Sequence, residues 1–173
     1  SWMQRGPLID VDQRMLTVRS IKLVADGALG SRGAWLLEPY SDRVGHNGLP
    51  TMPVSEMQDI SHLAYRNGFQ IAIHAIGDRA NREVLDIFDA LFDGRDRGVR
   101  FRVEHAQHIH PSDIGRFARL GVIPSVQGIH MSSDRPWAID RLGAARVESG
   151  AYMWRSLIDS GAVLVNGTDV PVE

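Results

Sequence analysis

Four side chains that could bind a metal or transfer a proton lie beside short apolar segments of the chain. His74 directly follows FQIAI, His105 follows FRVE, Asp169 lies just past VLVNGT, and Lys22 lies inside IKLV. Two imidazoles and a carboxylate suit Zn, Fe, Mn or Ni, which accept nitrogen and oxygen ligands. If the apolar segments are parallel strands, their carboxyl ends form one rim, where these residues would converge. The pattern therefore predicts a metal site at that rim.

Each of these residues has a simpler interpretation when it is taken singly. A histidine after a strand is more often a hydrogen-bonded structural residue than a ligand. Asp169, in GTDVP, could hold a turn, and Lys22 could reach solvent from the edge of a strand. Their joint placement on separate β/α units favours the metal site.

The segments that would position these residues alternate between strand and helix. Runs of β-branched and apolar residues predict strands at 15–24, 69–73, 99–103, 122–126 and 162–165. Helical periodicity predicts a helix from Ser55, with a capping box to Gln58, that stops at Gly68. Further helices are predicted at 79–92, 112–120 and 151–160, and long loops at 26–53 and 127–149.

This alternation predicts an α/β fold built from parallel β/α units. The short, almost continuously apolar strands are typical of a sheet buried on both faces. An open doubly wound sheet and part of a (β/α)8 barrel both fit the pattern. Five units are too few to close an eight-stranded barrel, which usually takes ~250 residues.

The composition excludes several other classes of protein. The 173 residues, 43% hydrophobic and 23% charged, suffice for one globular domain. A formal net charge of -2 gives no basic surface for nucleic acid or an anionic membrane. No apolar run approaches the ~18 residues of a membrane helix, and no signal peptide is recognised. Without cysteine there is no disulfide or thiolate metal site, and we expect a cytoplasmic protein.

Four stretches of the sequence resemble, in order, those of one enzyme family. They are IKLVADGALGSRGAWLLEPYSD, AIHAIGDRANREVLDIFDAL, FRVEHAQHI and WRSLIDSGAVLVNGTDVPVE. The resemblance is to the metal-dependent amidohydrolase superfamily, in its YtcJ-like branch (amidohydrolase family 3), and spans about 18–173. The superfamily carries Lys, His, His and Asp on strands four, five, six and eight of its barrel.

The resemblance implies a partial TIM (β/α)8 barrel. Residues 1–173 would be its C-terminal portion, holding strands four to eight and their helices. The N-terminal strands, the small β-sandwich and the His-x-His pair after strand one would lie outside this chain. HIH at 108–110 is an unsuitable substitute, because it lies in the loop after His105 rather than at a strand end.

By the same resemblance, the four aligned residues would form a centre with one or two divalent ions, with zinc expected. An N-carboxylated Lys22 would bridge two ions, since a bare ammonium cannot ligate a cation. His74 and His105 would bind one ion. Asp169 would bind the other and act as general base on the attacking water. The implied reaction is hydrolysis of a non-peptide C–N bond in a small amide or formamide-like substrate.

Three further residues are candidates for the site. Asp78 could orient His74 or simply start the following helix. Arg32, on the loop after the first of the aligned strands, could bind a substrate anion. His130 lies in the predicted loop at 127–149 and could reach the substrate.

The sequence offers two alternatives to this function. GALGSRG follows a strand, and its backbone amides could bind phosphate, but the spacing is that of neither a dinucleotide fingerprint nor a P-loop. Alternatively, the chain is a catalytically incomplete fragment or degenerate homologue that folds by self-association. Missing barrel strands would expose sheet edges and an apolar interior. We therefore expect a homo-oligomer, or dependence on a missing N-terminal part.

Overall fold

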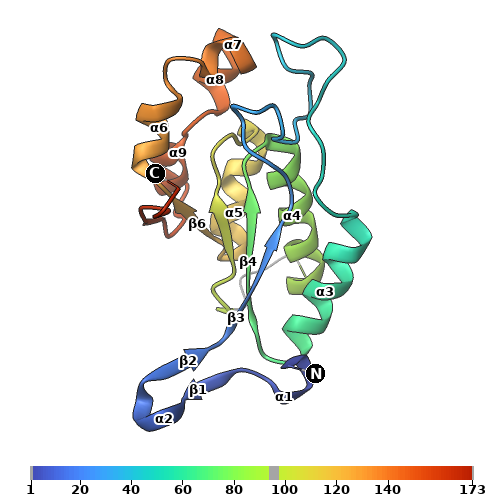
Figure 1. Ribbon diagram of the computed structural model, residues 1–173, viewed down its shortest axis with the longest axis vertical. Coiled ribbons are helices and arrows are strands. Elements are labelled where there is room, and N and C mark those ends of the chain that lie inside the picture. Colours follow the sequence, from blue (N-terminus) through green and yellow to red (C-terminus); the bar gives the residue numbers. More distant parts are fainter. Residues whose placement is uncertain (1, 94–97, 173) are drawn as a thin grey trace.

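The computed structural model describes residues 2–93 and 98–172 and has an α/β fold (Figure 1). Its strands are β1 (Leu8–Asp10), β2 (Leu16–Val18), β3 (Ser20–Val24), β4 (Gln70–Ala75), β5 (Arg102–His105), β6 (Ile123–Val126) and β7 (Val165–Asn166). Its helices are α1 (Trp2–Arg5), α2 (Val11–Arg14), α3 (Val54–Arg66), α4 (Asp78–Phe92), the 3-10 turn η1 (Pro111–Asp113), α5 (Ile114–Leu120), α6 (Gly128–Asp134), α7 (Ala138–Leu142), α8 (Ala144–Gly150) and α9 (Trp154–Asp159). No helix in the described ranges is long and apolar enough to span a bilayer.

The main sheet has five parallel strands in the order β3-β4-β5-β6-β7. Because this order follows the sequence without reversal, the sheet lacks the switch point of a doubly wound fold. It is instead the order of a barrel wall, with β3 and β7 as its two edges. The prediction of an α/β fold consistent with a partial barrel is confirmed.

A layer of helices covers one face of this sheet. α3 packs against α4, α4 against α5, and α5 against α9, and Figure 1 shows α3 and α4 beside β4. Ile73 and Val103, which are paired across β4 and β5, are completely buried in the same cluster as residues of these helices. The ring centroid of Phe101 lies 5.1 Å from that of Phe88 and from that of Phe92. Burial of this apolar surface is the main force that holds helices and sheet together.

The opposite face of the sheet carries polar side chains. The register places Val24 beside His74, and His74 beside Glu104. Because side chains alternate along a strand, Lys22 lies on the same face as Val24. Glu104 accepts a hydrogen bond of 2.7 Å from the Nε atom of Arg102. In a closed barrel this face would be the interior.

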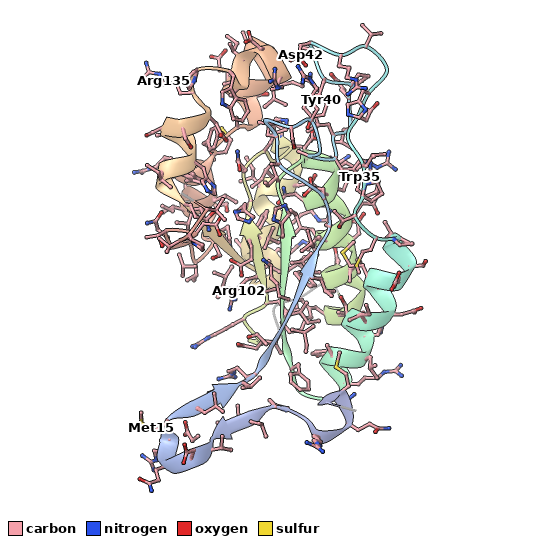
Figure 2. The ribbon with its side chains drawn as sticks, viewed as in Figure 1. Met15, Trp35, Tyr40, Asp42, Arg102 and Arg135 are labelled. Carbon is pink, nitrogen blue, oxygen red and sulfur yellow. The ribbon has the colours of Figure 1, made fainter. Side chains whose placement is uncertain are left out.

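The N-terminal residues form a separate hairpin in which β1 pairs antiparallel with β2. Met15, 83% exposed, lies near the tip of the hairpin, far from the helix layer (Figure 2). The prediction of one strand over 15–24 is therefore wrong. The chain leaves the hairpin after Val18, which pairs with Leu8, and enters the parallel sheet at Ser20, which pairs with Gln70.

The predicted helices at 79–92 and 112–120 are confirmed by α4 and by η1 with α5. The helix predicted from Ser55 is α3, but it begins at Val54 and no side chain caps it, so the capping box is wrong. The loop predicted at 127–149 is also wrong, because it contains α6, α7 and α8. These helices of five to seven residues are too short to show a clear period in the sequence.

The glycine-rich segment 26–53 has no helix or strand, as predicted, but hydrogen bonds within it fix its conformation. The Tyr40 hydroxyl donates to the Ala34 carbonyl at 2.9 Å, and the backbone N–H of Leu36 donates to the carbonyl of Asn47 at 2.7 Å. Tyr40 is buried, and Figure 2 places it at the end of the molecule opposite Met15. This segment therefore forms a fixed wall beside the carboxyl ends of the strands.

Candidate functional site

A cavity of about 420 Å³ opens at the carboxyl end of the main sheet. Five residues predicted for the site line it, namely Lys22, His74, His105, His130 and Asp169. The remaining lining residues are Ala28, Leu29, Gly30, Ile76, Gln107, Asp134, Trp137 and Val172. Convergence of the strand-end residues follows from the parallel sheet, because every strand delivers its carboxyl end to the same rim.

His74, in β4, meets the ring of His105 edge to face, with ring centroids 4.5 Å apart. The Nε2 atom of His74 is buried and has no hydrogen-bond partner in the structure. The Oδ1 atom of Asp26 lies 3.4 Å from it, but the two do not form a hydrogen bond. Leaving a polar atom buried and unpaired costs free energy, and a bound cation or water would remove that cost.

His105 ends β5, and a hydrogen bond to Gln127 fixes the tautomer of its ring. Its Nδ1 atom lies 2.8 Å from the Oε1 atom of Gln127, whose own Nε2 donates to the carbonyl of Ser125. The oxygen of Gln127 must therefore accept from Nδ1–H, which leaves Nε2 of His105 as the basic nitrogen. Burial, together with the neighbouring His74, lowers the pKa of His105 to about 4, so its imidazole is neutral at pH 7.

Asp26, which the sequence analysis did not select, organises the rim around His74. It is completely buried, and its Oδ1 atom accepts from the backbone N–H of Ile76 at 3.0 Å. Its Oδ2 atom accepts from the N–H groups of Trp35 and Gly77, each at 2.8 Å. The feature of the sequence that could have indicated Asp26 as a site residue is its position just past β3. The carboxylate thus ties the loop after β3 to the carboxyl end of β4.

His130 and Asp169 form the other polar part of the cavity. His130 lies in α6 rather than in a loop, and its Nε2 atom is 3.7 Å from Oδ2 of Asp169. Its ring stacks on that of His105 with centroids 5.6 Å apart. Within residues 2–93 and 98–172, no three His, Cys, Asp or Glu side chains are grouped so that they could hold a metal. The structure therefore brings two imidazoles into contact and places Asp169 beside His130.

Arg32 does not line this cavity. Its Nε and Nη2 atoms donate to the two carboxylate oxygens of Asp42 at 3.0 and 2.7 Å. The backbone of Arg32 is left-handed, with φ of 61°. The guanidinium is thus paired with Asp42 through two parallel hydrogen bonds, and a substrate role for Arg32 stays a prediction.

Asp78 begins α4, as the second of its two predicted roles requires, and Asp26 rather than Asp78 lies beside His74. The Oδ1 atom of Asp78 accepts from the N–H of Leu37 at 2.9 Å, and Oδ2 lies 3.5 Å from Nε2 of His108. His108 is buried, and neither of its ring nitrogens has a hydrogen-bond partner. Burial lowers the pKa of His108, against the attraction of Asp78.

Acid is expected to destabilise the metal-free protein through His105 and His108. A histidine whose folded pKa lies below its unfolded value adds stability above pH 6.5, which is lost as pH falls towards the folded pKa. With the pKa of His105 at about 4, moving from pH 7.5 to 5 should cost roughly 2 kcal/mol, and His108 adds a loss of the same sign. Urea unfolding in EDTA measures this. The free energy of unfolding should depend less on pH in His108→Asn than in the wild type. An equal dependence would contradict the lowered pKa of His108.

The fold and the cavity together define a class of protein. A parallel β/α sheet in barrel order, with polar groups gathered at the carboxyl ends of its strands, is the arrangement of (β/α) enzymes. The family follows from comparison with known proteins. A profile of the Amidohydrolase family matches residues 2–173, and the chain belongs to this family.

Individual relatives agree with this assignment. The chain is 36% identical over 171 residues to Protein LONG AFTER FAR-RED 3 of Arabidopsis thaliana, covering 98% of this chain and 29% of that protein. It is 36% identical over 154 residues to YtcJ of Bacillus subtilis (strain 168), covering 89% of this chain and 28% of that protein. The chain thus spans less than a third of the length of these relatives.

Solved structures of similar fold agree with the family assignment. An uncharacterized metal-dependent hydrolase from Pyrococcus furiosus superposes with a TM-score of 0.84 at 32% identity, covering 97% of this chain and 33% of that one. A second uncharacterized metal-dependent hydrolase, from Pyrococcus horikoshii OT3, gives a TM-score of 0.81 at 36% identity, covering 91% and 31%. The resemblance to the YtcJ-like branch of amidohydrolases is thereby confirmed.

Proposed function

We propose that this chain contributes to a metal-dependent hydrolase that cleaves a non-peptide C–N bond in a small amide. The observation that supports the proposal is the buried, unpartnered Nε2 atom of His74 beside His105, in a cavity at the carboxyl end of a parallel sheet. Membership of the Amidohydrolase family and the two metal-dependent hydrolases of similar structure support it independently.

The unpaired Nε2 atom of His74 and the types of the neighbouring side chains support a divalent cation such as zinc at this rim. The ring nitrogens of His74 and His105 would hold it, and Lys22 and Asp169 line the same cavity. Lys22 could act as a ligand once its amine is carboxylated, whereas an ammonium group has no lone pair to donate. When bound, such an ion acidifies water and polarises a carbonyl group.

The chain's own residues then have separate tasks. Gln127 accepts a hydrogen bond from Nδ1–H of His105. Nε2, on the other side of the ring, therefore keeps its lone pair. Asp169 would take a proton from the attacking water on Oδ2 and return it to the departing amine. His130, 3.7 Å from that oxygen, would orient the carboxylate of Asp169. The ring of Trp137 and the side chain of Leu29 line the cavity and would limit the access of water to it.

Elemental analysis of the purified protein tests the metal part of the proposal. We expect about one Zn, Fe, Mn or Ni ion per chain, lost in both His74→Ala and His105→Ala, since each substitution would remove one of the two imidazole ligands. His62→Ala is the matched control, because His62 lies on α3 and does not line the cavity. Metal that survives both substitutions, or is missing from the wild type, would contradict the proposal.

The alternative that these 173 residues do not turn over substrate alone is favoured by the open sheet. Among the described strands, β3 and β7 each pair on one side only. Apolar residues on or beside these two strands are exposed, including Val24 at 42% and Val163 at 68%. Exposed edges and apolar faces drive association. We therefore expect the chain expressed by itself to self-associate, which light scattering after gel filtration measures. A stable monomer across micromolar concentrations would contradict this expectation.

A further inference from the structure

Two segments that are far apart in the sequence form adjoining walls of the cavity. The glycine-rich segment 26–53 contributes Leu29 and Gly30, and the residue before α7 is Trp137. We propose that Arg141 is a positioning residue, which holds the indole of Trp137 in the cavity wall by joining α7 to the segment 26–53. The consequence for substrate binding rests on the proposed function, whereas the joint between the two walls does not depend on it.

The indole of Trp137 lies directly on the backbone of Gly30. A Cβ atom added to Gly30 would lie 3.1 Å from the Cη2 atom of Trp137, so the absence of a side chain at Gly30 leaves room for the ring. Trp137 also packs against a buried apolar cluster to which both walls contribute, with Leu29 from one and Leu142 from the other. The position of the ring therefore depends on how the two walls are held together.

Arg141 contacts both the ring and the opposite wall. It follows Trp137 by one helical turn, and its guanidinium lies 5.7 Å from the centre of the indole. The Nε atom of Arg141 donates to the carbonyl of Gly30 at 3.1 Å. The backbone N–H of Ser41 donates to the carbonyl of Arg141 at 2.8 Å. One residue thus contacts the ring, the glycine on which the ring lies and the segment 26–53.

The carboxylate of Asp42 is the other half of this joint, and Figure 2 places it at the end of the molecule where Figure 1 shows α7. It accepts a hydrogen bond from Nη1 of Arg141 and two from Arg32. The hydrogen bonds from Arg32, together with the charge of Arg141, hold the pKa of Asp42 below its usual range. The side chains of Arg141 and Asp42 are only 19% and 22% exposed, so solvent screens this pair less than a fully exposed one.

Apolar packing is the competing explanation for the position of the ring. Leu142, next to Arg141, is buried in the same cluster as Tyr40 of the segment 26–53. Burial of apolar surface resists separation of the walls, but it is non-directional and does not fix one position along them. The hydrogen bonds of the guanidinium are directional. The two explanations differ in whether removal of the guanidinium moves the indole of Trp137 while the protein stays folded.

A displaced indole would change the cavity without altering its polar groups. Neither Arg141 nor Asp42 lines the cavity, so both would act on a bound amide through Trp137. An amide held beside His74 and His105 would then lose part of one wall. Loss of the joint should therefore weaken the binding of an amide more than it slows the cleavage of its C–N bond.

Fluorine NMR of the purified protein labelled with 5-fluorotryptophan tests the inference. The chain has four tryptophans, and the resonance of Trp137 is the one that is missing from Trp137→Phe. In Arg141→Gln and in Asp42→Asn, we expect this resonance to move and its shift between H2O and D2O to grow about twofold, because the ring becomes more exposed. The other three resonances should stay in place. Gly30→Ala pushes the ring away without removing a charge and should move the same resonance.

Arg155→Gln is the matched control, because Arg155 donates to Asp159 at 2.9 Å on α9 and neither residue lines the cavity. It removes the same kind of ion pair and should leave the Trp137 resonance unchanged. Arg141→Lys keeps a cation near Asp42, so its resonance should lie between those of the wild type and Arg141→Gln. An unmoved Trp137 resonance in both Arg141→Gln and Asp42→Asn would overturn the inference. Equal displacement of all four resonances would also overturn it, since the change would then be a general loss of structure.

Metal analysis of the same proteins separates this inference from the proposed function. Arg141→Gln should hold as much metal as the wild type, because Arg141 does not line the cavity. If the Trp137 resonance moves as expected but the wild type holds no metal, the positioning role stands and the proposed function fails. If the wild type holds metal but the Trp137 resonance does not respond, the proposed function stands and the positioning role fails.

Discussion

Replacing Asp26 with alanine is expected to lower the free energy of unfolding by roughly 3–6 kcal/mol. The substitution leaves the N–H groups of Trp35, Ile76 and Gly77 without their acceptor. Each buried, unpaired donor costs on the order of 1–3 kcal/mol. Because domains of this size are stable by only ~5–15 kcal/mol, much of the total stability depends on this one carboxylate.

Urea unfolding of the Asp26→Ala protein measures this effect. Asp26→Asn keeps the shape and one acceptor oxygen, so it should lose about half as much. Asp59→Ala, on an exposed position of α3, should change stability by no more than about 0.5 kcal/mol. A loss below about 1 kcal/mol in Asp26→Ala would mean that water replaces the carboxylate without difficulty.

Replacing Gly77 with alanine should also cost about 3 kcal/mol or more. The new Cβ atom would lie 2.0 Å from the carbonyl oxygen of Trp35. That oxygen cannot move freely, because it accepts from the N–H groups of Arg79 and Ala80 in the first turn of α4. Relief of the clash must therefore disturb the start of α4 or the wall that contains Trp35, whose position Figure 2 shows.

Thermal unfolding of Gly77→Ala should show a lower midpoint than that of the wild type. Gly115→Ala is the contrasting variant, since nothing lies within 4 Å of the atom that it adds on α5. Alanine favours a helix over glycine, so this variant should be more stable by about 0.5 kcal/mol. Similar midpoints for the two alanine variants would show that the Trp35 carbonyl yields easily.

The sequence predicted the strand-end residues of the cavity because parallel strands impose their convergence. Prediction of His74 and His105 required only that the ends of their strands be located. The two rings are in contact with each other in the structure. Periodicity over fifteen residues likewise predicted α4, one residue short at its start. In these cases a local pattern and the overall architecture point to the same answer.

Other features depend on contacts that no local pattern contains. The link between Asp26 and the amides at Ile76 and Gly77 spans about fifty residues of chain. The pairing of Arg32 with Asp42, ten residues later, is likewise a contact that the sequence pattern did not indicate. The short helices α6, α7 and α8 are held by buried residues such as Leu142 rather than by long amphipathic faces.

The uninterrupted order of the five parallel strands has a kinetic consequence. Each strand pairs only with its neighbours along the chain, so the sheet can grow one unit at a time as in a repeat array. β4, β5 and β6 have partners on both sides, whereas β3 and β7 have one each. Amide hydrogens should therefore exchange most slowly in the three central strands, with protection falling towards both ends of the sheet.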